Sequence, residues 1–175
     1  MFGIFSRTKA KPPSGSEMSE NGLRLVADAI AKNAIQLEQG RIYPDIYVHA
    51  DEPDGGLRIT YLMFSSSVQN QLIARSAFCL SRAQQGIPIW QIDCAVLAQY
   101  RGEGFGTAIA TKSLAEFVGG MSKHSENGFV VEAVVDDEKN EAALQIARNL
   151  IGGEEVLFDK SKGVNVHSFI RKFAA

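Results

Sequence analysis

Residues 101–107 read Arg-Gly-Glu-Gly-Phe-Gly-Thr and lie between an apolar, strand-like run and a helix-like run. Glycine tolerates backbone conformations with positive φ and lets the main chain approach a ligand closely. At the beginning of a helix the first N–H groups have no intrahelical partner, and the helix dipole adds a favourable potential for an anion. The stretch is therefore predicted to be a phosphate-binding turn between a strand and a helix.

Glycine spacing separates this turn from two other phosphate-binding loops. A dinucleotide fingerprint needs GxGxxG, whereas here the glycines at 102, 104 and 106 are one residue too tight. A Walker loop needs GxxxxGK[ST], but residues 106–113 carry Thr111 where the second glycine must be. A structural role is the other alternative, in which the glycines only allow a tight turn and close packing of helix on sheet.

Working outward from the turn, hydrophobic periodicity and turn residues predict three helices and seven strands. The helices run from Ser19 to about Gln39, from Gly104 to about Val118 before Gly119-Gly120, and from Asn140 to Ile151. The strands are 45–50, 57–64, 72–81, 87–98, 129–135, 155–158 and 164–173. Residues 72–82 also fit a helix by composition, and the almost wholly apolar run 129–135 is typical of a strand buried on both faces. This order predicts a mixed α/β fold, a sheet with helices packed on it.

The chain has the length of one domain. Residues 1–18 are predicted to be a flexible N-terminal segment and linker, and residues 19–175 a single domain. The first nine residues are apolar and then basic, which is the reverse of a signal peptide. Such a terminus suits a disordered tail, a membrane surface or a partner subunit.

Charge and composition exclude several classes of protein. A net charge of −2 provides no long-range attraction for nucleic acid or anionic lipid. No apolar run approaches the length of about 18 residues that a transmembrane helix needs, so the cytoplasm is the expected compartment. Cys79 and Cys94 lie in apolar runs and are expected to be reduced, buried thiols. The three histidines are scattered, and no metal site is predicted.

The motif Arg-x-x-Gly-x-Gly after a strand resembles the coenzyme-A loop of the GNAT acetyltransferases. Upstream, residues 96–106 (VLAQYRGEGFG) are similar to that family's strand end, Tyr-Arg-Gly and Gly-x-Gly, with Ala98 where a proline is common. Downstream, residues 140–143 (NEAA) open a helix after a strand, like the family's second coenzyme-A segment. The resemblance extends from residue 72 to the C-terminus and implies a GNAT-like central sheet, mixed and mostly antiparallel, with helices on both faces.

The resemblance also implies acetyl-CoA as co-substrate. Main-chain N–H groups from about residue 103 to 107 would hold the pyrophosphate, with the Thr107 hydroxyl as a further donor and Arg101 as scaffold or positive charge. The strand end would pair its backbone with the pantetheine arm, whose far end Asn140 would help to hold. The implied cofactor-binding residues are Val96, Leu97, Arg101, Gly102, Glu103, Gly104, Phe105, Gly106, Thr107 and Asn140.

The chemistry implied is direct attack of a primary amine on the acetyl thioester, with the Leu97 backbone N–H as oxyanion donor. Asp93 and Glu132 are candidate bases, since each is a carboxylate in an apolar strand whose pKa burial would raise. The alternative is that each faces a polar edge or pairs with an arginine such as Arg75. The tyrosine acid of many family members falls at Ala147, which cannot donate a proton.

The expected function is that of an acyl-CoA-dependent N-acyltransferase acting on a small-molecule or peptide amine. The alternative is a catalytically inactive GNAT-fold module that binds acyl-CoA or another protein. Asp136 and Asp137 could face a cationic acceptor, or could be solvated loop acids. Homodimers are common in the family, and the apolar N-terminus is one surface that could serve such a contact.

Overall fold

The computed structural model describes residues 14–68, 70–160 and 163–174. Its helices are α1 (Gly15–Ala31), α2 (Phe105–Met121) and α3 (Glu141–Leu150), with short 3-10 turns η1 (Pro53–Gly55) and η2 (Ala98–Tyr100). Its strands are β1 (Glu38–Gln39), β2 (Ile46–Asp51), β3 (Arg58–Phe64), β4 (Leu72–Gln84), β5 (Ile87–Val96), β6 (Phe129–Val135), β7 (Glu154–Asp159) and β8 (Val164–Phe173). None of the described helices is long and apolar enough to span a membrane.

The strands form one sheet in the order β1-β2-β3-β4-β5-β6-β8-β7. Every neighbouring pair is antiparallel except β5 and β6, which run parallel. The predicted mixed, mostly antiparallel sheet is therefore confirmed, and residues 72–82 belong to a strand rather than a helix. A parallel pair needs a long crossover, which α2 supplies between β5 and β6.

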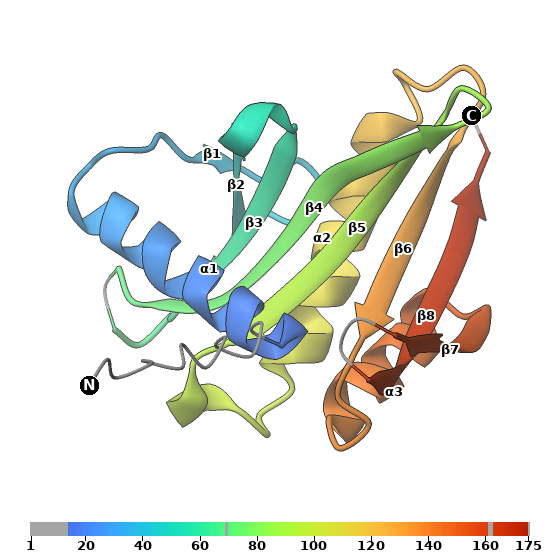
Figure 1. Cartoon of the computed structure of the whole chain (residues 1–175). Helices are drawn as coiled ribbons and strands as arrows, with labels where there is room; N and C mark the ends of the chain where they lie inside the picture. The colour runs from blue at the N-terminus through green and yellow to red at the C-terminus, as the bar shows by residue number, and fades with distance from the viewer. Residues whose placement is uncertain (1–13, 69, 161–162, 175) are drawn as a thin grey trace, which may run out of the picture.

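Helices cover the two faces of the sheet unequally. Figure 1 shows α1 in front of β3, β4 and β5, and α2 and α3 behind the sheet. Beneath α1 lies a small core of Leu23, Leu62, Leu72 and Ala95. Behind the sheet lies the larger core, in which the Phe117 ring stacks on Phe78 at 4.0 Å between centroids. Among the described residues, no helix lies over the front of β6, β8 and β7 (Figure 1).

The first helix differs from its prediction at both ends. Its N-cap is Ser14, whose hydroxyl accepts the Glu17 N–H in a capping box, so residues 15–18 are helical rather than linker. Ser19, the predicted cap, is buried in the first turns and donates to the Gly15 carbonyl. The helix ends eight residues early because Asn33 takes a left-handed φ of 50° and Ala34 N–H bonds back to Ala29 O. Residues 38–39, predicted as helix, pair with β2 instead.

Two further predictions need correction. Helix α2 continues through Gly119 and Gly120 to Met121, because neither glycine takes a conformation that ends a helix. Strand β6 has the predicted bounds but is not buried on both faces, since Val134 is 44% exposed. The predicted flexible residues 1–13 lie outside the described part of the chain.

Replacement of Phe117 by alanine is expected to destabilise the protein by about 3 to 5 kcal/mol, because its ring is 1% exposed and contacts Phe78, Trp90 and Phe129. Urea unfolding followed by circular dichroism measures the loss. The matched control is Leu25→Ala on α1, where the side chain is 61% exposed and little change is expected. Equal losses in the two variants would contradict the proposed core.

Candidate functional site

Strands β5 and β6 separate toward their carboxyl ends. Their parallel pairing runs from Ile89–Val130 to Ile92–Ala133 and ends there, although both strands continue. Figure 1 shows the two ribbons diverging below this point. The backbones of the two strands are therefore unpaired beyond Ile92 and Ala133. This break in the backbone pairing is here called the notch, and Asp93 lies at its apex as the first residue of β5 beyond the last pair.

The glycine turn follows β5 at the mouth of the notch. Gly104 caps α2 with φ 84° and Gly102 has φ 83°, a left-handed conformation that favours glycine. The first hydrogen bond of the helix is donated by Ala108 N–H to Gly104 O. The N–H groups of residues 105–107 therefore come before the first intrahelical acceptor and have no intrahelical partner. Gly106 has a packing role, since a Cβ there would lie 3.3 Å from Ile146 Cδ1. Close packing, one of the two roles weighed for the glycines, thus occurs in this turn, and the phosphate-binding role stays a prediction.

Arg101 and Tyr100 brace the turn from two sides. Arg101 Nε donates to Val96 O at 3.1 Å, and its Nη2 lies 2.5 Å from Glu20 Oε1 on α1. The Tyr100 hydroxyl donates to Gln71 Oε1 at 2.8 Å in the β3–β4 connection. Of the two functions expected for Arg101, scaffold and positive charge, these contacts support the scaffold.

The predicted oxyanion donor Leu97 is contradicted by the hydrogen bonding of the strand end. Leu97 N–H donates to Ile73 O of β4 at 2.9 Å and therefore faces away from the notch. Along a strand, backbone N–H and C=O groups alternate between the two edges. The backbone N–H and C=O groups of Cys94 and Val96 consequently face the notch. The Val96 carbonyl already accepts a hydrogen bond from Arg101 Nε. The backbone donors available in the notch are the N–H groups of these two residues.

Asp93 lies on the α1 face of the sheet beside a buried arginine. Arg75 Nη1 is 2.6 Å from Asp93 Oδ1; the Arg75 side chain is 4% exposed and that of Asp93 38%. Gly22 of α1 makes room for the guanidinium, because a Cβ there would meet Arg75 Cζ at 2.9 Å. Burial raises the pKa of the Asp93 carboxyl, and the neighbouring Arg75 opposes that rise. The arginine partner that the sequence offered for Asp93 is therefore present, and its role as a base stays a prediction.

Glu132 is held as an ionised carboxylate, as expected if it pairs with an arginine rather than acting as a base. Arg82 Nη1 lies 3.0 Å and Gln91 Nε2 3.1 Å from Glu132 Oε2. Burial raises the pKa of Glu132, but the hydrogen bonds from Arg82, Gln91 and Ser168 outweigh it, so the pKa is lowered. A carboxylate with a lowered pKa is a weaker base, so the geometry favours Asp93 over Glu132 for that role.

Helix α3 begins at the residue expected to hold the pantetheine end. Asn140 Oδ1 accepts Ala143 N–H at 3.1 Å and caps the helix, so its carbonyl oxygen has a structural use. The Asn140 amide nitrogen is the group that remains for a ligand. Ala147, at the position of the expected acid, is 5% exposed and packs in the larger core, so this position does not face the notch.

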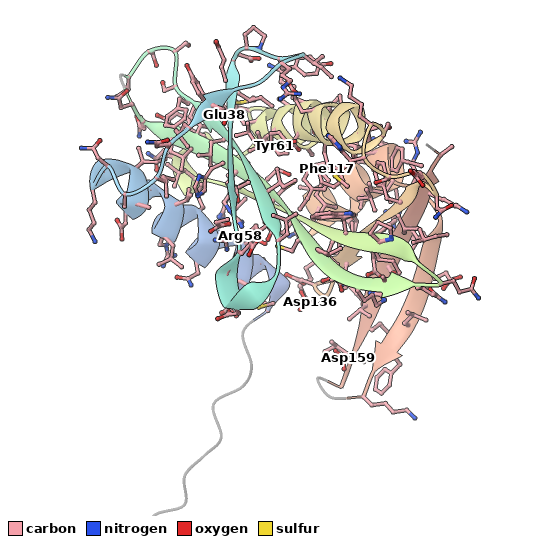
Figure 2. All side chains as sticks on the ribbon, turned by 90° about the horizontal axis from the view of Figure 1, so that it is seen from above. Glu38, Arg58, Tyr61, Phe117, Asp136 and Asp159 are labelled. Carbon is pink, nitrogen blue, oxygen red and sulfur yellow. The ribbon has the colours of Figure 1, made fainter. Side chains whose placement is uncertain are left out.

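The first turns of α1 connect the two sides of the notch. Asp136, just after β6, accepts Gly15 N–H with both carboxylate oxygens at 2.9 and 3.0 Å. Figure 2 shows Asp136 beside the beginning of α1. Five residues along the helix, Glu20 meets Arg101 of the turn. Asp136 is therefore not a solvated loop acid, as the sequence favoured; it anchors α1. Neither contact had a signal in the local sequence, because each joins residues far apart in the chain.

The remaining candidate chemistry is limited. Cys79 and Cys94 are both free thiols, and burial raises the pKa of Cys94 to about 12, which keeps it protonated. Within residues 14–68, 70–160 and 163–174, no three His, Cys, Asp or Glu side chains gather into a group that could hold a metal ion.

Comparison with known proteins found no matching family model and no matching curated protein. Among solved structures, a GNAT acetyltransferase from Streptococcus pneumoniae is similar at a TM-score of 0.49 and 14% identity, over 67% of each chain. The NatC complex bound to Gag peptide and CoA is similar at a TM-score of 0.49 and 16% identity, over 67% of this chain and 71% of that chain. A mutant of the spermidine N-acetyltransferase SpeG from Vibrio cholerae is similar at a TM-score of 0.48 and 11% identity, over 87% of this chain and 90% of that chain. GNAT acetyltransferases are thus among the solved structures that this chain resembles.

The lowered pKa of Glu132 predicts a pH-dependent contribution to stability. A depressed pKa stabilises the folded state above the unfolded value of 4.5, and this stabilisation is lost as the pH falls below it. Urea unfolding at pH 6.5 and 3.5 should therefore show Glu132→Gln clearly less stable than the unmodified protein at pH 6.5, with a smaller difference at pH 3.5. A difference that stays constant or grows on acidification would contradict the assigned pKa.

Proposed function

We propose that this protein is an acyl-CoA-dependent N-acyltransferase that transfers an acetyl group from acetyl-CoA to a primary amine. The observation that supports it best is the notch between β5 and β6, which has a carboxylate of raised pKa at its apex and a glycine turn leading into α2 at its mouth. A thioester lying in the notch would come close to both.

In this proposal the turn binds the pyrophosphate of coenzyme A through the amides of residues 105–107, aided by the positive end of α2. The pantetheine arm enters the notch beside β5. There the N–H groups of Cys94 and Val96 take the place that Leu97 was expected to fill, pairing with the arm and donating to the thioester oxygen.

Asp93 acts as the base. It takes one proton from the ammonium form of the acceptor, and the neutral nitrogen then attacks the thioester carbon and forms a C–N bond. As the C–S bond breaks, the nitrogen gives its second proton to water, which leaves an amide and the thiolate. Because a thiol has a pKa of about 8.5, the thiolate can leave without a strong acid and take its proton from water. The buried Ala147 is therefore compatible with transfer.

The second candidate is a module that binds acyl-CoA without transferring the group. Two observations favour it: Ala147 replaces the expected acid, and Arg75 holds the Asp93 carboxylate at 2.6 Å. Turnover separates the candidates. Thiol release from acetyl-CoA is measured against polyamines, amino acids, aminoglycosides and peptides, and release with any of them supports the transferase. Saturable binding of acetyl-CoA without release on the whole panel supports the module.

Replacement of Gly104 by glutamate is expected to weaken coenzyme-A binding about 5- to 700-fold. A carboxylate at about 4 Å from a phosphate charge costs about 1 to 4 kcal/mol between a water-like and a surface-like dielectric. Titration calorimetry with coenzyme A measures the affinity. The matched control is Gly55→Glu, because Gly55 has a φ of 79° and equally open space around its Cβ but lies in the β2–β3 connection.

The control should be as strained as the Gly104 variant yet bind normally. Unchanged affinity in a folded Gly104→Glu protein would disprove the phosphate-binding role of the turn. Equal weakening in both variants would assign the effect to backbone strain instead.

Asp93→Asn is expected to lower kcat for thiol release by about 10²- to 10⁴-fold, the usual contribution of a general base. In the unmodified protein kcat should rise with pH as Asp93 deprotonates above its ordinary pKa of 3.8, and the variant should lose this rise. Glu132→Gln is the control, since it makes the same chemical change in a carboxylate that Arg82 already holds. If both variants keep the rate and the pH profile, Asp93 is not the base.

A further inference from the structure

Beyond the notch, the front of the sheet continues the face on which Asp93 lies. Asp93 points to the front, because its partner Arg75 lies beneath α1. Val131 and Ala133 of β6 pack in the larger core behind the sheet, so by alternation Val134 points to the front. Asp93 and Val134 are the first residues of β5 and β6 beyond the last pair, and they therefore share one face of the sheet at the notch.

The strand register extends this line of side chains to the edge of the sheet. Val134 pairs with Ser168 of β8, and Ser168 pairs with Glu155 of β7, so these three side chains lie on the same face. From β5 to β7 the line contains Asp93, Val134, Ser168 and Glu155, and it is here called the front row. Ser168 is buried, whereas Val134 is 44% exposed. The front row thus has a carboxylate at each end and an exposed apolar side chain between them.

Glu155 supplies a negative charge at the far end of the front row. Its side chain is exposed, and within the described part of the chain no hydrogen bond or ion pair holds its carboxylate. The neighbouring Glu154 points behind the sheet, where it is bonded to Arg148 and His167. Glu155 is therefore available to a cationic group that lies on the front of the sheet.

The surroundings of Asp93 limit the direction from which an acceptor can approach it. Toward β4, Asp93 is paired with Ala77, which is fully buried, and the buried Arg75 fills the space beneath α1. Toward β6 the next side chain is Val134, and Ile170 on β8 is 43% exposed on the same face. An amine with its nitrogen at Asp93 therefore has its remaining atoms over Val134 and Ile170.

We propose that the acceptor is a diamine or polyamine, an inference that rests on the proposed transferase function. One amino group lies at Asp93, the hydrocarbon chain lies over Val134 and Ile170, and a second ammonium group lies at Glu155. Adjacent strands are about 4.8 Å apart, so Val134 and Glu155 are about 10 Å apart and Asp93 is at least one spacing farther away. With single bonds of about 1.5 Å, the nitrogens of an extended eight-carbon diamine are about 11 Å apart, a gap to the two carboxylates that their side chains can close.

The kinetic test compares acetyl transfer to 1,8-diaminooctane with transfer to octylamine, which has the same chain and a single amino group. The ratio of kcat/KM for the diamine to that for the monoamine is expected to fall about 2- to 5-fold in Glu155→Gln, the usual contribution of an exposed ion pair. Glu154→Gln is the control, since it makes the same change in the adjacent residue behind the sheet, and it should keep the ratio. An unchanged ratio in Glu155→Gln, or an equal fall in both variants, would overturn the inference.

Binding is measured separately, so that the result does not depend on turnover. Amide signals are recorded in the presence of coenzyme A while 1,8-diaminooctane is added. Saturable shifts at Val134, Ser168 and Glu155 are expected, with weaker binding in Glu155→Gln and unchanged binding in Glu154→Gln. If these shifts occur but neither amine is acetylated, the transferase proposal fails while the recognition of diamines is supported. Absence of the shifts would overturn the inference, whether or not transfer occurs.

Discussion

The loss of backbone pairing between β5 and β6 beyond Ile92 and Ala133 is the constraint around which the rest of this structure is arranged. Buried backbone N–H and C=O groups need partners, and two strands that separate inside a sheet lose theirs. Arg101 satisfies the carbonyl of Val96 from the turn, and Leu97 turns its N–H to β4. The N–H groups of Cys94 and Val96 remain directed into the notch, where an extended ligand can replace the missing strand.

Asp93 and Glu132 show how different surroundings shift the pKa values of two carboxylates in opposite directions. Both lie on apolar strands, and burial raises the pKa of each. At Glu132 the donors Arg82 and Gln91 outweigh burial, whereas at Asp93 burial outweighs Arg75. The outcome is an ionised structural group in the sheet and a carboxylate of raised pKa at the notch apex, which is the property that the proposed base needs.

Helix α1 contacts both sides of the notch and leaves part of the sheet uncovered. It anchors to β6 through Asp136, to the turn through Glu20, and makes space over Arg75 at Gly22. A ligand that enters the notch therefore does so beneath a helix fastened on both sides. Because α1 covers only β3 to β5, no helix of the described residues lies over the front of β6, β8 and β7.

Local sequence signals predicted most of the elements, since they depend on periodicity and turn residues within a few positions. The bounds of β6 and β8 match, and the start of α2 at the glycine turn and of α3 at Asn140 follow from capping chemistry. The errors in α1 are of the same local kind, because Ser14 and Glu17 form a capping box and Asn33 is a residue that tolerates a left-handed φ. The continuation of α2 through Gly119 and Gly120 shows that glycine permits a helix end without requiring one.

The sequence by itself thus determined the order of strands and helices, the glycine turn with its likeness to a coenzyme-A loop, and the candidate carboxylates. Only the tertiary structure decided that Leu97 N–H is taken by β4, that Asp136 anchors α1, and that Asp93 and Glu132 have pKa values shifted in opposite directions. The physical reason is the range of the interactions. Periodicity and capping act between near neighbours, whereas hydrogen bonds and burial at a site join strands and helices that are distant in the chain.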